Sequence, residues 1–178
     1  EAFTSTLHEM TLAGLTTLML HGTIAKRADF LNQITELKNV KDLRVLRGEN
    51  VKKQFGAGTD HEQPRDDVER RVLETGQPYL QLSDNGSVLR AVTPAFARKN
   101  YLGKDCTSCH ALAPVDAVLG AVSMEISLDD VNATVRLFGI KIFFIAASLS
   151  LPVLLFLYFF TSRVLTRPMQ QMTLGLEG

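Results

Sequence analysis

A long run without charged residues near the end of the chain is the feature that most constrains the fold. Residues 142–160 contain no Asp, Glu, Lys or Arg, and Ile, Phe, Leu, Val and Ala dominate the run. A helix of about 19 residues is close to the length that crosses the hydrocarbon core of a bilayer. Pro152 fits this interpretation, because membrane helices tolerate proline. A buried core helix is the alternative, but one so long and free of charge is rare in a small domain. We therefore predict a transmembrane helix over 139–161.

The charges around this run predict its orientation. Arg163 and Arg167 follow the run closely, whereas the residues before it carry both signs, including Asp129 and Asp130. Lys and Arg are in excess on the cytoplasmic side of membrane helices. We therefore expect residues 162–178 in the cytoplasm and residues 1–138 on the other side of the membrane.

Composition narrows the function classes. The 178 residues allow one compact domain in addition to the membrane helix. The chain has 19 Lys and Arg against 19 Asp and Glu, so its formal net charge is zero. Nucleic acid is therefore not an expected partner, because phosphate binding requires a basic surface. The two cysteines are too few for a disulfide-stabilised miniprotein.

The residues before the membrane run predict helices around a small sheet. Apolar spacing predicts one long helix over residues 1–37, and short patterns predict a strand over 40–46 and a helix over 50–55. Asp66 or Asp67 can begin the next helix, and Gly76 can end it.

A hairpin and a last strand complete the predicted sheet. Asn85-Gly86 lies between apolar runs at 79–82 and 88–93, which is a strong hairpin signal. The stretch after Pro94 is basic and irregular, residues 119–126 predict a strand, and Ser127 can begin a helix that continues into the membrane run. The expected class is α+β, with a small antiparallel sheet, a long N-terminal helix and a C-terminal helix continuing into the membrane.

The strongest chemical signal is the motif Cys106-Thr107-Ser108-Cys109-His110. Two thiols at this spacing can add to the two vinyl groups of one porphyrin, and the adjoining imidazole can then ligate its iron. C-x-x-C-H is the pattern of c-type haem attachment. We therefore predict one covalent haem c, held by Cys106 and Cys109 with His110 as an axial ligand. Haem is normally attached outside the cytoplasm, which agrees with the orientation predicted from charge.

Three other roles compete for this motif. A zinc site would require four ligands, and His8, His21 and His61 are the only further histidines. A thioredoxin-like pair would require a strand before the motif and a helix beginning after it. A disulfide across so short a loop would be strained. The haem interpretation is preferred to these three, because C-x-x-C-H is the pattern of c-type haem attachment.

The sixth iron ligand is open among several side chains and water. Met19 is the predicted ligand, because it lies in the apolar stretch Leu18-Met19-Leu20, with His21 and water as alternatives. A methionine ligand would raise the reduction potential. Core packing is the ordinary role of a helical methionine and competes with this assignment. The full set of candidate side chains is Met10, Met19, Met124, His8, His21 and His61.

Basic residues near the motif are candidates to hold the haem propionates. Arg90 is the predicted partner, and Tyr101 is predicted to pack on the ring edge. A solvated basic loop is the alternative role, and Arg98, Lys99 and Lys104 share both possibilities. The sequence offers no Ser-His-Asp arrangement, placed pair of carboxylates or phosphate-binding glycine loop, so we do not expect an enzyme.

The order of segments around the motif resembles the periplasmic haem-c sensor domains of bacterial methyl-accepting chemotaxis proteins. The resemblance covers most of residues 10–135, and C-x-x-C-H alone would not distinguish this family from other cytochromes. The tail Thr166-Arg167-Pro168-Met169 resembles the start of a HAMP linker. The other matching segments are Leu18–Gly22, Leu43–Arg47, Leu73–Gly76 and Val118–Ser123.

The resemblance implies a PAS-like domain in the periplasm, anchored in the bacterial inner membrane. It implies a homodimer that exchanges N-terminal helices, in which Met19 reaches the haem of the partner subunit. It also implies a first membrane helix before Glu1 and an output module beyond Gly178.

Two functions follow from these expectations. The first is a membrane-bound haem receptor for signal transduction that responds to redox state or to a small gaseous ligand such as NO or CO. The alternative is a membrane-anchored monohaem cytochrome c that transfers electrons to a redox partner. A haem peroxidase is a weaker third idea, because no acid–base residues are convincingly placed. The HAMP-like tail favours the receptor, since an electron carrier has no use for it.

Overall fold

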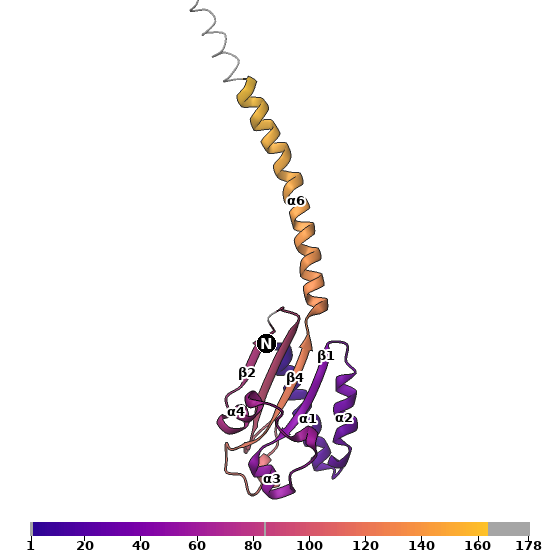
Figure 1. Ribbon diagram of the computed structural model, residues 1–178, viewed down its shortest axis with the longest axis vertical. Helices are drawn as coiled ribbons and strands as arrows, with labels where there is room; N and C mark the ends of the chain where they lie inside the picture. Colours follow the sequence, from indigo (N-terminus) through magenta and orange to yellow (C-terminus); the bar gives the residue numbers. More distant parts are fainter. Residues whose placement is uncertain (1, 84, 164–178) are drawn as a thin grey trace, which may run out of the picture. The chain divides into compact units, whose positions relative to one another are not determined.

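A computed structural model describes residues 2–83 and 85–163 of the chain. The chain divides into two compact units, Glu1–Asp129 and Asp130–Gly178. The first unit is built on a four-stranded antiparallel sheet (Figure 1). In spatial order its strands are β1 (Val40–Arg47), β4 (Val118–Ser127), β3 (Val88–Phe96) and β2 (Tyr79–Leu82). The predicted mixed class and small antiparallel sheet are confirmed.

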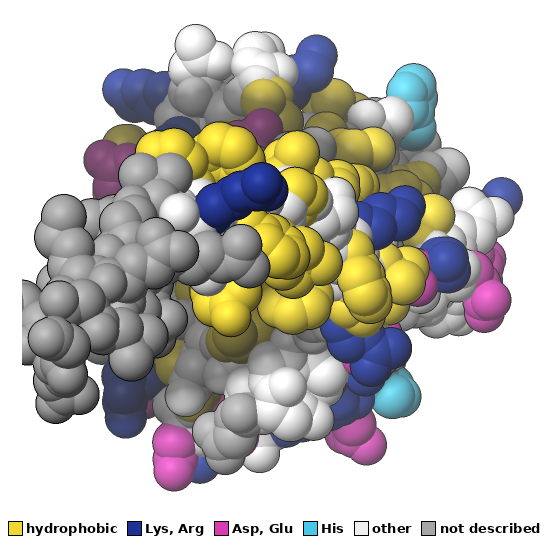
Figure 2. Space-filling model, turned by 90° about the horizontal axis from the view of Figure 1, so that it is seen from above, with side chains coloured by type: hydrophobic (Ala, Val, Ile, Leu, Met, Phe, Trp, Pro, Cys, Tyr) yellow, Lys and Arg dark blue, Asp and Glu magenta, His cyan; other side chains and the backbone are white. Residues whose placement is uncertain are grey.

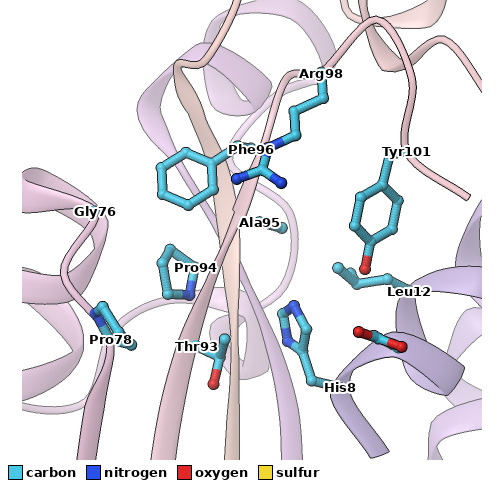
Figure 3. Close-up of a pocket in the computed structure, with 11 residues that line it drawn as sticks. His8, Leu12, Gly76, Pro78, Thr93, Pro94, Ala95, Phe96, Arg98 and Tyr101 are labelled. Atoms are coloured by element: carbon cyan, nitrogen blue, oxygen red, sulfur yellow. The ribbon is translucent and has the colours of Figure 1, made fainter. Parts of the chain in front are cut away.

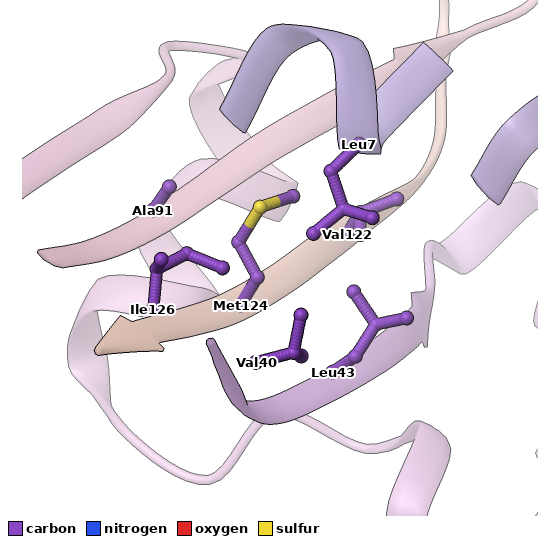
Figure 4. Close-up of a cluster of buried hydrophobic side chains, with 7 residues drawn as sticks. All are labelled: Leu7, Val40, Leu43, Ala91, Val122, Met124 and Ile126. Carbon is purple, nitrogen blue, oxygen red and sulfur yellow. The ribbon is translucent and has the colours of Figure 1, made fainter. Parts of the chain in front are cut away.

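Helices cover both faces of this sheet. Successive side chains of a strand point to opposite faces, and here both faces carry apolar side chains that are buried against helices. One face carries Leu43, Ala91 and Met124 and packs against Leu7 of helix α1 (Ala2–Leu20) (Figure 4). Helix α2 (Arg27–Thr35) adds Leu31 and Ile34 to the same core. The other face packs against helix α4 (Asp67–Thr75) through the buried residues Leu46, Val72, Val92 and Ala121.

The single N-terminal helix predicted over residues 1–37 is wrong, because the chain forms two helices there. Gly22 adopts φ +66, a left-handed conformation that glycine accepts readily. Its N–H donates to the Met19 carbonyl at 3.1 Å, and the Thr23 N–H donates to the Leu18 carbonyl at 2.8 Å. This pair of bonds is the Schellman motif that ends a helix. A short 3₁₀ turn, η1 (Ile24–Lys26), then leads into α2.

The two short helices predicted over 50–55 and from Asp66 or Asp67 to Gly76 form close to the predicted boundaries. Helix α3 spans Glu49–Phe55, and the 3₁₀ turn η2 spans Asp60–Glu62. The side chain of Asp66 accepts from the Glu69 N–H at 2.9 Å and begins α4, and Gly76 ends it in the left-handed region. The hairpin between β2 and β3 also forms as predicted, with Gly86 at φ +67 in its turn.

Strand β3 continues through the stretch predicted to be irregular. Pro94 pairs with Ala121 of β4, and the strand ends only at Phe96. The pairing of β2 with β3 stops at Val92, opposite Tyr79. Beyond that point β3 is an edge strand, and edge strands tolerate a residue that lacks an N–H.

An ion pair lies inside the core beneath α4. Arg44 of β1 and Glu69 of α4 are both buried, with 3.0 Å between Nη1 and Oε1. Glu69 also accepts hydrogen bonds from the Ser123 hydroxyl and the Arg65 N–H, each at 2.7 Å. Arg44 donates to the backbone carbonyls of His61 and Gln63. The network therefore joins the sheet, the helix and the η2 loop.

The second unit is dominated by helix α6 (Asp129–Thr161), which contains Pro152. It is the one helix in the described part of the chain that is long and apolar enough to cross a membrane. Figure 2 shows hydrophobic side chains gathered over this helix, with few charged ones among them. The predicted C-terminal apolar helix is therefore confirmed. The HAMP-like segment 166–169 lies outside the described residues.

Candidate functional site

The cysteine motif forms a single helical turn, α5 (Cys106–Cys109). Asp105 begins the turn, because its Oδ1 accepts from the Thr107 N–H at 2.8 Å. The His110 N–H donates to the Cys106 carbonyl at 3.0 Å and closes the turn. Local hydrogen bonds therefore fix the backbone of the two cysteines and the histidine as one unit.

Both cysteines are free thiols in this turn. Cys106 is half-buried and Cys109 is exposed, so both sulfurs are available for covalent chemistry. The segment before α5 is a loop that contains an isolated bridge between Tyr101 and Lys104. A thioredoxin-like site would have a strand there and a longer helix after it. The local structure thus lacks the context for that alternative.

The imidazole of His110 is enclosed by protein. The side chain is only 9% exposed, and its ring lies edge-on to Phe55 of α3, with 5.5 Å between ring centroids. Burial lowers the pKa of His110 below its usual value. Its Nδ1 is buried and has no hydrogen-bond partner among the described residues. A neutral imidazole with a free ring nitrogen is the form that ligates a metal.

Helix α3 anchors the motif as well as covering His110. The side-chain amide of Gln54 donates from Nε2 to the Cys109 carbonyl at 2.9 Å. Its Oε1 accepts a longer hydrogen bond, 3.5 Å, from the Leu112 N–H. Gln54 therefore binds the backbone on both sides of His110. The sequence pattern gave no indication of this role, since Gln54 is far from the motif in the chain.

A pocket of about 280 Å³ lies between α1 and the end of β3 that β2 leaves uncovered (Figure 3). Two of its lining side chains have buried polar atoms without a partner among the described residues, Nδ1 of His8 and the hydroxyl of Tyr101. Burial lowers the pKa of His8 to about 4. The other lining residues are Glu9, Leu12, Gly76, Pro78, Thr93, Pro94, Ala95, Phe96 and Arg98.

The pocket adjoins the cysteine motif. The Cys106 N–H donates to the carbonyl of Arg98, a lining residue, at 2.9 Å. The pKa of Tyr101 is raised by burial first, and by the charges of Glu9 and Cys106. The predicted placement of Tyr101 beside the attached group is therefore compatible with its position, and it stays a prediction.

The two other predicted site residues lie apart from this pocket. The guanidinium of Arg90 forms ion pairs with Asp66 and, at 3.7 Å, with Glu69. Met19 is 40% exposed and is not among the residues that line the pocket. Both assignments stay predictions. Arg98 does line the pocket, and its guanidinium lies over the Phe96 ring at 5.5 Å from the centroid.

The donor set fits a covalently attached haem. Two unpaired thiols lie on one turn, and the imidazole that follows them is buried with one ring nitrogen that has no hydrogen-bond partner among the described residues. Among residues 2–83 and 85–163, no group of three or more His, Cys, Asp or Glu side chains is arranged to hold a metal ion alone. The zinc alternative therefore finds no ligand cluster in that part of the chain.

The sequence was also compared with known proteins. It matches no family model and no curated protein. Functional inference therefore starts from the residues of the motif, the pocket and the long apolar helix.

Proposed function

We propose that the chain is a membrane-bound c-type haem receptor that responds to redox state or to a small gaseous ligand. The observation that carries the proposal is the α5 turn, in which two free thiols are followed directly by the buried imidazole of His110. In this proposal Cys106, Cys109 and His110 would hold the haem, the two thiols through thioether links and the imidazole through the iron. The bound haem would supply an iron that changes oxidation state or accepts a gas at its sixth position.

The surrounding elements give the motif a route toward the membrane. The chain passes from α5 into β4, and only Leu128 separates β4 from α6. Two hydrogen bonds join the ends of the loop that carries the motif. The Asp116 N–H donates to the Ala97 carbonyl at 2.8 Å, and the Ala97 N–H donates to the Ala117 carbonyl at 2.9 Å. A change at the motif can therefore reach β4 through a short, hydrogen-bonded segment.

The remaining parts of the proposal concern the setting of the receptor. We place α6 across the bacterial inner membrane, with the haem domain in the periplasm as a PAS-like homodimer. The length of α6 and its exposed apolar side chains support a membrane span. The periplasmic placement rests on the chemistry of the motif, because haem c is attached outside the cytoplasm.

Covalent haem is the first test. The chain would be expressed with a cytochrome c maturation system, purified in detergent and denatured on a gel. We expect haem peroxidase stain to follow the polypeptide. Cys106→Ser and Cys109→Ser together should abolish the stain, whereas Ser108→Ala, on the same turn, should retain it. A wild-type chain that loses all its haem to acidic acetone would contradict the proposal.

A second test separates the receptor from an electron carrier. Hydrogen exchange of the holo chain in lipid nanodiscs would be compared between the oxidised, reduced and CO-treated states. A receptor requires two arrangements that the iron state biases differently. We therefore expect exchange to change in α1 and around Leu128. Unchanged exchange in all three states, together with rapid electron exchange with a soluble redox protein, would favour the carrier.

A further inference from the structure

We propose that His8 of α1, and not Met19, is the sixth ligand of the haem iron. The inference rests on the proposed haem attachment and names the side chain that would bind the iron in addition to His110. Three observations carry it: the burial of His8 without a partner for one ring nitrogen, its place in the lining of a pocket, and the position of that pocket beside the cysteine turn.

The first observation is that His8 is a buried side chain in which one ring nitrogen has no hydrogen-bond partner among the described residues. It is 8% exposed, and its Nδ1 is buried without a hydrogen-bond partner among the described residues. Buried polar atoms are nearly always paired, and each exception calls for an explanation such as an absent ion. A metal bound through one ring nitrogen would account for the burial of an imidazole here.

The second observation is that His8 lines a space rather than a closed core. Figure 3 shows its ring beside Thr93, on the same side of the pocket as Tyr101 and Leu12. The Tyr101 hydroxyl, the second unpartnered buried atom, belongs to the same pocket. The pocket therefore combines two unpartnered polar groups with apolar side chains, among them Leu12, Pro94 and Phe96. Such a lining suits a ligand that is largely apolar and carries a few polar atoms.

The third observation is continuity with the motif. One wall of the pocket is formed by Phe96, Arg98 and Tyr101, the segment that leads directly into Cys106. The hydrogen bond from the Cys106 N–H to the Arg98 carbonyl, 2.9 Å, fixes the first thiol residue to that wall. A group fastened at Cys106 therefore has the His8 pocket next to its attachment point.

Met19 competes for the same role but occupies a different part of α1. It lies eleven residues after His8, which corresponds to about 16 Å along the helix axis. Its side chain is 40% exposed and does not line the pocket. Within one subunit the two side chains cannot serve the same site without a large movement of α1. Met19 remains the ligand expected if a partner subunit supplies it.

The assignment has a mechanical consequence for the receptor. If His8 were a ligand, it would link α1 to the iron, and His110 would link the same iron to the end of α5. Ligand loss or replacement by a gas would then release α1 directly. A histidine in place of methionine would also give a lower reduction potential, because methionine ligation raises it.

The test uses the full-length holo chain in detergent, with optical and electron paramagnetic resonance spectra of the oxidised and reduced iron. We expect wild type and Met19→Leu to show the same six-coordinate low-spin spectra, without the charge-transfer band of a thioether on ferric iron. His8→Gly should become high-spin and bind CO more rapidly. Added imidazole should restore the low-spin spectrum of His8→Gly, which also shows that this variant is folded.

Other outcomes overturn the assignment. If Met19→Leu becomes high-spin while His8→Gly stays low-spin, methionine is the ligand. If both variants resemble a high-spin wild type, the sixth position holds water or is open. Each of these results leaves covalent haem in place and so spares the proposed function. Absence of covalent haem from the wild type would instead remove the proposed function itself.

Discussion

Arg44 and Glu69 form a buried ion pair, with 3.0 Å between Nη1 and Oε1 and side-chain exposures of 4% and 2%. They lie on different elements, β1 and α4, and 25 residues separate them in the sequence. Both charges have further partners, namely two carbonyls for Arg44 and the Ser123 hydroxyl and Arg65 N–H for Glu69. Removing one member would leave the other charged and unpaired in the core.

We therefore expect Glu69→Ala to lower the free energy of unfolding by about 3 to 5 kcal/mol, the usual cost of breaking a buried pair. Urea denaturation of the detergent-solubilised chain, followed by circular dichroism, would measure it. Asp67→Asn in the same helix is the control, because that carboxylate is 84% exposed beside Arg70. An exposed pair contributes less than about 1 kcal/mol. Equal losses for the two variants would refute the role given to the buried pair.

The contacts of Glu62 predict that the domain loses stability in acid. Its carboxylate receives Arg27 at 2.7 Å, the Thr59 N–H at 2.8 Å and Arg47 at 3.1 Å. Burial alone raises the pKa of Glu62, but these contacts outweigh it and hold the pKa below the usual 4.5. Because the pKa of Glu62 is lower in the folded state than in the unfolded state, its carboxylate stabilises the fold fully above about pH 4.5. This stabilisation disappears as the pH falls through the folded-state pKa.

Unfolding free energies measured between pH 3 and 7 would test this prediction. Glu62→Gln should lower stability at pH 7 by on the order of 1 to 2 kcal/mol, typical of charge-assisted hydrogen bonds, and should flatten the acid dependence. Glu49→Gln is the matched control, since Glu49 is 75% exposed beside Lys52. An acid dependence that is as steep in Glu62→Gln as in wild type would contradict the assignment.

Gly120 is predicted to tolerate no side chain. A Cβ added there would lie 2.2 Å from the Leu46 carbonyl oxygen of the neighbouring strand, which is backbone and cannot rotate away. Gly120→Ala should therefore destabilise the domain by about 1 to 3 kcal/mol or more, as overpacking does. Gly139→Ala in α6 is the control, because nothing lies within 4 Å of an added Cβ there. Equal thermal unfolding temperatures for both variants would be the contrary result.

Leu151 lies near the middle of the charge-free run and tests the membrane assignment. Arg at the centre of a membrane helix costs about 2.5 to 3.5 kcal/mol of insertion free energy. Leu151→Arg should therefore lower the fraction of the chain that resists alkaline carbonate extraction. Val131→Arg, near the start of α6, should behave as wild type. A wild-type chain that is released completely by carbonate would mean that α6 does not span the membrane.

Short-range signals in the sequence predicted much of the fold. Asp66 and Gly76 bound α4 because a side-chain cap and a left-handed glycine act within one turn of the helix. Asn85-Gly86 marks the hairpin for the same reason. Gly22 carried an equally local signal for the end of α1, but the apolar spacing on both sides of it suggested one continuous helix. The part of β3 beyond Thr93 was missed because Pro94 normally argues against a strand.

The residues of the candidate site that are adjacent in the sequence could be predicted, whereas those that only the fold brings together could not. Cys106, Cys109 and His110 form one motif, so their order alone indicates the chemistry. His8 and Tyr101 share a pocket only because α1 packs against β3 and the loop that follows it. Arg90 was predicted from its proximity in sequence, yet the fold places its guanidinium on Asp66. Such pairings depend on the sheet register, which no local pattern encodes.

A single residue, Leu128, separates β4 from α6, so in the proposed receptor any signal from the domain to α6 would pass through β4. β4 is held by hydrogen bonds to β1 on one side and β3 on the other. Sliding it by one residue would exchange its inward and outward side chains, so that Met124 would leave the core. Under the proposed receptor function, a signal carried by sliding β4 within the sheet would therefore disrupt the core. A signal that leaves the sheet pairing intact would not have this cost.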